Sequence, residues 1–150
     1  DFTRPAEVVA GMNRHFDMES HNDLFFTLWY GVYDQTERRL RYSAAGHPPA
    51  LVCLPDGRVE TLSLPGLPVG CSEDARFREA SAEIPRNASL YVFSDGVFEV
   101  PRRDGSMGQF EDAVALVRDK PCPATLIGRI REEMDGASFE DDVSLVRVLF

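Results

Sequence analysis

The sequence predicts an α+β fold in which antiparallel sheets are covered by helices. Three observations predict it. Strand-like segments follow one another in runs, and short turns join several of them. Helical patterns are set apart from these runs, near the start of the chain and in its last third. A final alternating segment closes the chain as a strand. At 150 residues the chain has the size of one domain.

The first elements are a helix and a long hairpin. Apolar residues recur at helical spacing over residues 4–16, with Pro5 suited to the first turn and Thr3 as the expected N-cap. Residues 24–33, LFFTLWYGVY, are aromatic and branched, which is typical of a strand. The polar run 34–38 separates them from the alternating segment LRYSA, and the two segments predict an antiparallel hairpin.

A second hairpin is expected from ALVCL and VETLSL around the turn 55–57, which contains Pro, Asp and Gly. Further strands fit residues 76–84 and 88–93. Helical patterns return at 108–117 and 123–134, before the last strand, VSLVRVLF.

Composition excludes several classes of protein. The net charge of -9 and the pI near 4.8 oppose binding to nucleic acid. No apolar run is long enough to span a bilayer, and the start DFTRPAEVV lacks the layout of a signal peptide, so we expect no membrane partner and a cytoplasmic location. The cysteines are far apart and odd in number, which predicts three reduced structural thiols: Cys53, Cys71 and Cys122.

A carboxylate stands at the end of a predicted buried strand. Asp95 follows the apolar run 90–93 and precedes Gly96, which allows the backbone to turn. One interpretation is that Asp95 caps this turn by accepting hydrogen bonds from backbone N–H groups.

The last strand is also preceded by acids, in the run Glu140, Asp141 and Asp142. These carboxylates and Asp95 would repel one another at neutral pH unless a cation held them together, and oxygen ligands suit Mg²⁺ or Mn²⁺. Asp95 and Asp141 are 46 positions apart, so the residues alone leave both the cap and the metal ligand open.

Six segments in order resemble the metal-dependent (PPM-type) Ser/Thr protein phosphatases in their bacterial SpoIIE-like branch. The segments are FFTLWYGVYD, RLRYSAAGHPPALV, DGRVETL, GLPVG, SLYVFSDGVFEV and FEDDVSLVRV. The opening helix, with PAEVVAGMN, also resembles the helix that precedes the first of these strands in the family. Each piece is short, but the set and its order are specific together.

The resemblance implies an αββα sandwich of two antiparallel sheets flanked by helices, with a binuclear Mn²⁺ or Mg²⁺ site at one end. In that family the Asp of the motif matched by Ser94-Asp95-Gly96 is a metal ligand, as is the first Asp of the pair matched by Asp141-Asp142. Asp95 and Asp141 are therefore the predicted ligands. Asp142 is the third candidate for the metal site, expected to assist beside the metal or to begin the last strand.

The activity implied is hydrolysis of phosphoserine or phosphothreonine on a regulatory protein, for example an anti-sigma-factor antagonist, by a metal-activated water. Family members are attached to an upstream sensor or receiver module, so the resemblance implies such a domain in the parent chain. The sequence contains neither a Cys in a phosphate-binding cradle nor a Gly-rich loop that ends in Lys-Ser. A cysteine phosphatase and a P-loop nucleotide-binding protein are therefore not favoured.

One family segment has no match. The acidic segment of type Gly-Asp-x-x-Asp, followed by Asp-x-x-Gly-His-Gly, is absent, so residues 1–150 resemble the C-terminal two-thirds to three-quarters of one phosphatase domain. The chain does not begin with Met and is expected to be a piece of a longer protein, weak or inactive alone. The alternative function is a non-catalytic binding or dimerisation module that keeps the fold. An edge left by a missing strand would invite a homodimer.

Two other features suggest chemistry but have simpler interpretations. His47, in the segment GHPP, is predicted to be a hydrogen-bonded structural residue rather than a proton donor. Arg102 and Arg103 suit phosphate contact by type, but their place beyond the Asp95 motif favours a solvated loop.

Overall fold

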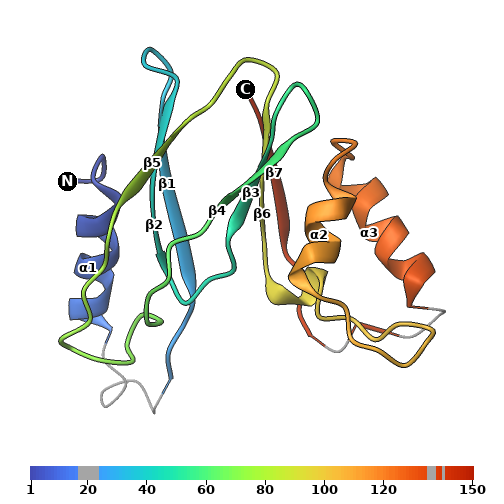
Figure 1. Ribbon diagram of the computed structural model, residues 1–150. Helices are drawn as coiled ribbons and strands as arrows, with labels where there is room; N and C mark the ends of the chain where they lie inside the picture. The colour runs from blue at the N-terminus through green and yellow to red at the C-terminus, as the bar shows by residue number, and fades with distance from the viewer. Residues whose placement is uncertain (17–23, 135–137, 140) are drawn as a thin grey trace. The chain divides into compact units, whose positions relative to one another are not determined.

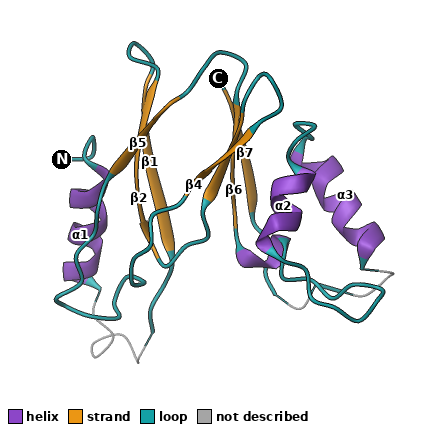
Figure 2. Cartoon of the chain, in the orientation of Figure 1, coloured by secondary structure: helices purple, strands orange, loops and turns teal. Residues whose placement is uncertain are grey.

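The computed structural model describes the chain except for a few short segments, with the described ranges being 1–16, 24–134, 138–139 and 141–150 (Figure 1). The chain divides into two compact units, and each contains one antiparallel sheet. The first unit comprises residues 1–49 and 63–84, and the second comprises residues 50–62 and 85–150. Figure 2 shows strands and helices in both units, which confirms the predicted α+β class.

The sheet of the first unit has the strand order β1-β2-β5, formed by β1 (Leu28–Asp34), β2 (Arg39–Ala45) and β5 (Ala80–Glu83). The predicted hairpin is confirmed, because β1 pairs antiparallel with β2. Asp34 shapes its turn: its Oδ1 accepts the amides of Glu37 at 2.9 Å and Thr36 at 2.8 Å. These two bonds, that from Glu37 foremost, lower the pKa of Asp34.

Helix α1 (Pro5–His15) packs on this sheet through a small apolar cluster. Val9 is fully buried there with Ala45 and Val69. The predicted helix is confirmed, but the expected N-cap is wrong. The side-chain and backbone donors of Thr3 both bond to Asp1 Oδ1, at 2.8 and 2.9 Å, so Thr3 is engaged before the helix begins, and Arg4 occupies the N-cap position.

The sheet of the second unit has the strand order β4-β3-β6-β7 and is antiparallel throughout. Its strands are β3 (Ala50–Cys53), β4 (Val59–Leu62), β6 (Ser89–Phe93) and β7 (Leu145–Leu149). The predicted second hairpin is confirmed as β3 and β4. A short 3₁₀ turn, η2 (Asp95–Val97), follows β6, and the unit also contains α2 (Phe110–Leu116) and α3 (Pro123–Glu133).

The core of the second unit lies between one face of its sheet and helices α2 and α3. Alternate residues of β3 and β6 point into it, because neighbouring side chains of a strand face opposite sides. The buried residues are Leu51, Cys53, Tyr91, Phe93, Val97, Val100, Ala113, Val117, Leu126, Ile130 and Met134. The hydroxyl of Tyr91, at the centre, donates to the carbonyl of Pro121 at 2.8 Å, which satisfies a buried polar atom.

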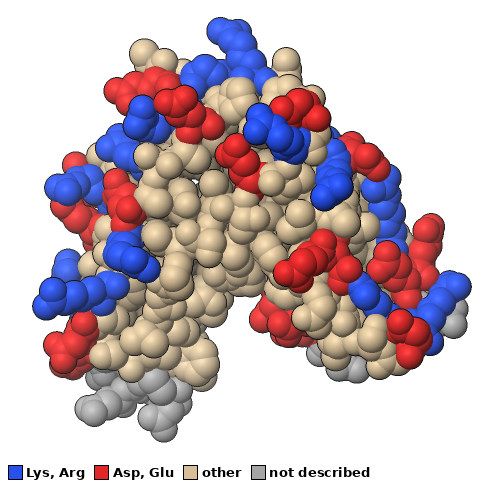
Figure 3. Space-filling model, in the orientation of Figure 1, with Lys and Arg blue, Asp and Glu red and all other residues tan. Residues whose placement is uncertain are grey.

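The three cysteines agree with the prediction of reduced thiols. All of them are free, with Cys53 buried and Cys122 exposed. On the face drawn in Figure 3, basic and acidic side chains are interspersed. Among the described residues, no helix is both long and apolar enough to cross a membrane.

Asp112 organises the start of α2. Its Oδ2 accepts the amide of Gln109 at 2.6 Å and also contacts the guanidinium of Arg102. The bond from Gln109, followed by the contact with Arg102, lowers the pKa of Asp112. The charged carboxylate therefore stabilises both the helix start and the loop that carries Arg102.

We predict that Asp112→Asn lowers the free energy of unfolding by about 1 kcal/mol at pH 7, the usual worth of a helix-capping group. The pKa of Asp112 is lower in the folded protein than in the unfolded chain, where it is about 4. The stabilisation by Asp112 is therefore present above the unfolded pKa and is lost as pH falls through the folded pKa. Urea unfolding at pH 7 and at pH 3 measures both effects. An equal difference between wild type and variant at the two pH values would contradict this account.

Candidate functional site

The candidate site lies at one end of the second sheet, where β6 ends and β7 begins. Phe93, the last residue of β6, pairs with Leu145, the first residue of β7. Because the strands are antiparallel, the segment that follows β6 lies beside the segment that precedes β7. Asp95 and Asp141 are carried by these two segments, so the structure brings their parts of the chain together.

Hydrogen bonds from Ser94 join the two segments beyond the last strand pair. The amide of Ser94 donates to the carbonyl of Ser144 at 3.0 Å. The Ser94 hydroxyl donates to the carbonyl of Asp142 and accepts the amide of Ser144, both at 2.9 Å. Sequence reasoning missed Ser94, because its only signal was a small polar residue at the end of an apolar run.

Gly96 allows the segments to approach closely. A Cβ built on Gly96 would lie 2.8 Å from the carbonyl oxygen of Asp142 and 3.4 Å from Val143 Cγ2. A real Cβ does not come so near a backbone oxygen. The φ angle of Gly96 is not positive. The sequence interpretation, in which Gly96 lets the backbone turn, was therefore incomplete. A glycine is needed here because the two segments approach closely, not because the backbone is left-handed.

The two predicted ligands have similar surroundings. Asp95 is exposed, and its Oδ1 accepts the amide of Gly96 at 3.0 Å. Asp141 is also exposed, and its Oδ1 accepts the amide of Asp142 at 2.7 Å. Asp95 thus makes the local bond that the cap interpretation requires. Since the bond from the amide reaches Oδ1 in both residues, it does not occupy Oδ2.

Asp142 is exposed and contributes its backbone carbonyl to the junction, as the acceptor for Ser94. Glu140, the first acid of the predicted run, lies outside the described residues. Within the described ranges, no three His, Cys, Asp or Glu side chains gather closely enough to hold a metal ion. The carboxylates suit Mn²⁺ or Mg²⁺ by chemistry, as part of a larger set of oxygen ligands.

His47 makes a local contact, in agreement with the structural role that was predicted for it. Its Nδ1 lies 2.8 Å from the carbonyl oxygen of Pro48, the next residue, and the side chain is half-buried. Gly46 precedes it with a φ of 66°, a left-handed conformation in which a Cβ would also meet Pro68 at 2.6 Å.

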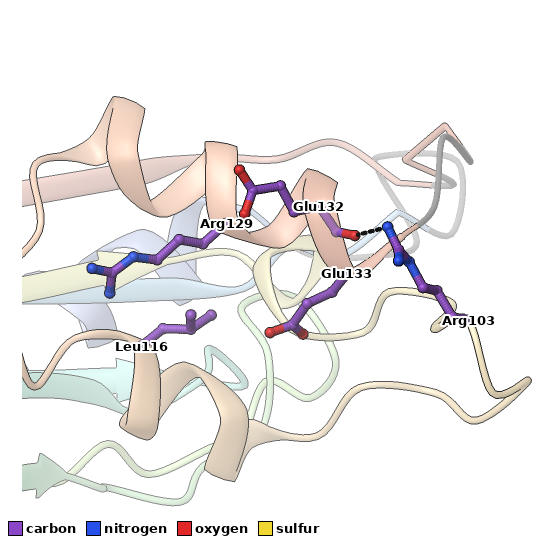
Figure 4. A pocket seen from close by; sticks show the side chains of 5 residues that line it. All are labelled: Arg103, Leu116, Arg129, Glu132 and Glu133. Carbon is purple, nitrogen blue, oxygen red and sulfur yellow. Dashed lines mark hydrogen bonds between the residues drawn. The ribbon is translucent and has the colours of Figure 1, made fainter.

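Arg102 and Arg103 have structural partners instead of lying on a merely solvated loop. Arg102 pairs with Asp112, and Arg103 Nη2 donates to the carbonyl of Glu132 in the last turn of α3 at 3.0 Å (Figure 4). Arg102 therefore connects its loop to the start of α2, and Arg103 connects it to the end of α3. Arg103 also lines an open hollow of about 580 Å³, together with Leu116, Arg129, Glu132 and Glu133.

Comparison with known proteins identifies the family. The family model described as Stage II sporulation protein E (SpoIIE) matches residues 2–150. Phosphoserine phosphatase RsbU of Bacillus subtilis (strain 168) is 25% identical over 119 residues, which cover 79% of this chain and 35% of RsbU. The chain therefore spans about a third of the length of this curated relative.

Solved structures agree on the fold. The SiaA-PP2C domain of Pseudomonas aeruginosa superposes with a TM-score of 0.83 at 15% identity, covering 99% of this chain and 61% of that one. The phosphatase domain of SpoIIE from Bacillus subtilis, presoaked with Mn, superposes with a TM-score of 0.65 at 16% identity, covering 82% and 56%. The two antiparallel sheets with their helices are those of the PP2C-type phosphatase fold, as the sequence resemblance implied.

We predict that Gly96→Ala destabilises the protein by about 1–3 kcal/mol, because the new methyl group must displace the backbone at Asp142. Gly128→Ala is the matched control. Gly128 lies inside α3, and a Cβ at this position would meet nothing within 4 Å, so alanine should stabilise the protein by up to about 1 kcal/mol.

Urea unfolding of the two glycine variants measures these effects. A stability for Gly96→Ala that equals or exceeds that of the wild type would show that the β6–β7 junction is looser than described.

Proposed function

The chain belongs to the SpoIIE family, and we propose that it is part of a metal-dependent protein serine/threonine phosphatase. The observation that carries the proposal is the junction of β6 and β7, which places the segments of Asp95 and Asp141 side by side. The relative RsbU is named a phosphoserine phosphatase, which supports the same activity here.

Asp95 and Asp141 would hold the cations, with Asp142 as the third carboxylate of the site. When bound, a pair of divalent cations supplies a water of lowered pKa and neutralises charge on the phosphate oxygens. The part of the chain is to present carboxylate oxygens at fixed positions on two neighbouring segments. Mn²⁺ and Mg²⁺ both suit these ligands, and the Mn-presoaked SpoIIE domain supports Mn²⁺ as the ion to test first.

The proposed substrate is phosphoserine or phosphothreonine on a cytoplasmic regulatory protein, such as an anti-sigma-factor antagonist. Support comes from the name of RsbU and from another structural neighbour, which contains RsbU and RsbW domains of Rv1364c from Mycobacterium tuberculosis in one chain. A parent protein in which a phosphatase domain is joined to a sensor or receiver module fits this role.

We propose further that residues 1–150 form the C-terminal two-thirds to three-quarters of a single phosphatase domain. The match covers 61% of the SiaA-PP2C chain, slightly less than two-thirds, which supports a partial domain of about this extent. The carboxylates of the described residues would then be only some of the metal ligands. Among the described residues no group of three is found, so Asp95, Asp141 and Asp142 do not form a metal site by themselves, and the proposal requires further ligands.

The test compares the 150-residue chain with a chain extended through the upstream segment of the parent protein. We predict that the extended chain binds Mn²⁺ and hydrolyses a phosphoserine peptide, and that the short chain does both weakly, because a cation held by one or two carboxylates keeps most of its waters. In the extended chain, Asp95→Asn should abolish turnover and weaken Mn²⁺ binding while leaving the fold intact. Calorimetry and phosphate release measure these outcomes.

Asp56→Asn is the matched control for the loss of one carboxylate. Asp56 lies in the β3–β4 turn, at the opposite end of the same sheet, where it pairs with Arg58 at 2.7 Å. This variant should keep full activity. Turnover that survives Asp95→Asn would refute the site assignment, and an extended chain that binds no metal would favour the non-catalytic module.

A further inference from the structure

We propose that Ser94 is a positioning residue, whose hydroxyl sets the spacing between the segments that carry Asp95 and Asp141. The structural part of this inference stands on hydrogen bonds alone. Its consequence for metal binding rests on the proposed function.

The hydroxyl of Ser94 replaces a backbone acceptor of the β6–β7 ladder. The register that pairs Phe93 with Leu145 would next pair Ser94 with Ser144. The first bond of that pair is present, from the amide of Ser94 to the carbonyl of Ser144 at 3.0 Å. In a regular antiparallel pair, the amide of Ser144 would return a bond to the carbonyl of Ser94. Here it donates instead to Ser94 Oγ at 2.9 Å.

This replacement allows the carbonyl of Ser94 to begin the turn that carries Asp95. That carbonyl accepts the amide of Val97 at 3.1 Å, the bond that closes the η2 turn over Asp95 and Gly96. The chain can thus leave the sheet at Ser94 without leaving the Ser144 amide unpaired. Ser144 is exposed, so water could also pair with its amide, but the Ser94 hydroxyl replaces that water by a bond that ties the two segments together where the strand becomes a turn.

The same hydroxyl also holds the other segment. As a donor, Ser94 Oγ reaches the carbonyl of Asp142 at 2.9 Å, so it bridges two backbone groups that flank Val143. Asp95 directly follows Ser94, and Asp141 directly precedes Asp142. One side chain therefore holds the backbone next to Asp95 and the backbone next to Asp141. The close approach at Gly96 leaves little room for one segment to slide along the other.

Alanine at position 94 would remove both bonds while keeping the backbone amide of the ladder, and threonine would keep the hydroxyl. Ser89→Ala is the matched control. Ser89 is a buried serine at the other end of β6, the strand that Ser94 follows, and its Oγ accepts from Arg147 at 3.0 Å. The Ser89→Ala variant tests whether the loss of a serine hydroxyl elsewhere on β6 changes hydrogen exchange and Mn²⁺ binding in the same way as Ser94→Ala.

The first readout needs no metal. Amide hydrogen exchange of the metal-free protein, followed by NMR, should show Ser144 exchanging about 5- to 10-fold faster in Ser94→Ala, the factor expected from one lost hydrogen bond. Ser94→Thr and Ser89→Ala should leave Ser144 close to wild type. An unchanged Ser144 rate in Ser94→Ala would overturn the proposal.

The second readout is Mn²⁺ affinity by calorimetry in the extended chain used for the phosphatase assay. Ser94→Ala should weaken binding by about 5- to 10-fold, since the carboxylates must then be ordered on binding, and Ser94→Thr should restore it. Equal weakening by Ser89→Ala would overturn the link to metal. If the wild type binds no Mn²⁺, the proposed function fails, and the exchange rate of Ser144 alone decides whether the hydroxyl holds the two segments.

Discussion

The pairing of β6 with β7 is the constraint on which the candidate site depends. It joins two stretches of chain about fifty residues apart and aligns the end of one with the start of the other. The face of β6 that carries Tyr91 and Phe93 is fixed by packing against α2 and α3, so a slip of one residue would turn these aromatic side chains out of the core. Core packing thereby sets the register, and the register places Asp95 beside the segment of Asp141.

The acids at this junction are held by local backbone bonds. Asp95 and Asp141 each accept one backbone amide and remain exposed to solvent. Carboxylates brought close together repel one another, and a divalent cation is a group that would reverse such repulsion. Under the proposed function, folding supplies the backbone geometry in which these carboxylates would hold a cation.

Much of the fold could be predicted from the sequence because its signals are local. Periodicity and turn residues located both hairpins and the helices α1, α2 and α3, although Thr3 bonds to Asp1 instead of capping the first helix. The order of strands within each sheet depends on contacts between distant residues and was not predicted. The role of Ser94 was hidden for the same reason, because its partners Asp142 and Ser144 become neighbours only when β7 joins β6. The proposal that Asp95 and Asp141 are metal ligands came from resemblance.

The central claim is that one metal site lies between the segments of Asp95 and Asp141. The most direct test is paramagnetic broadening of the backbone NMR signals of the extended chain by substoichiometric Mn²⁺. A single metal cluster between the two segments should broaden the amide signals of Asp95 and Gly96 together with those of Asp141 and Asp142. The signal of Gly57, in the turn at the opposite end of the sheet, should remain sharp. Broadening of only one of the two segments, with the other as sharp as Gly57, would contradict the account.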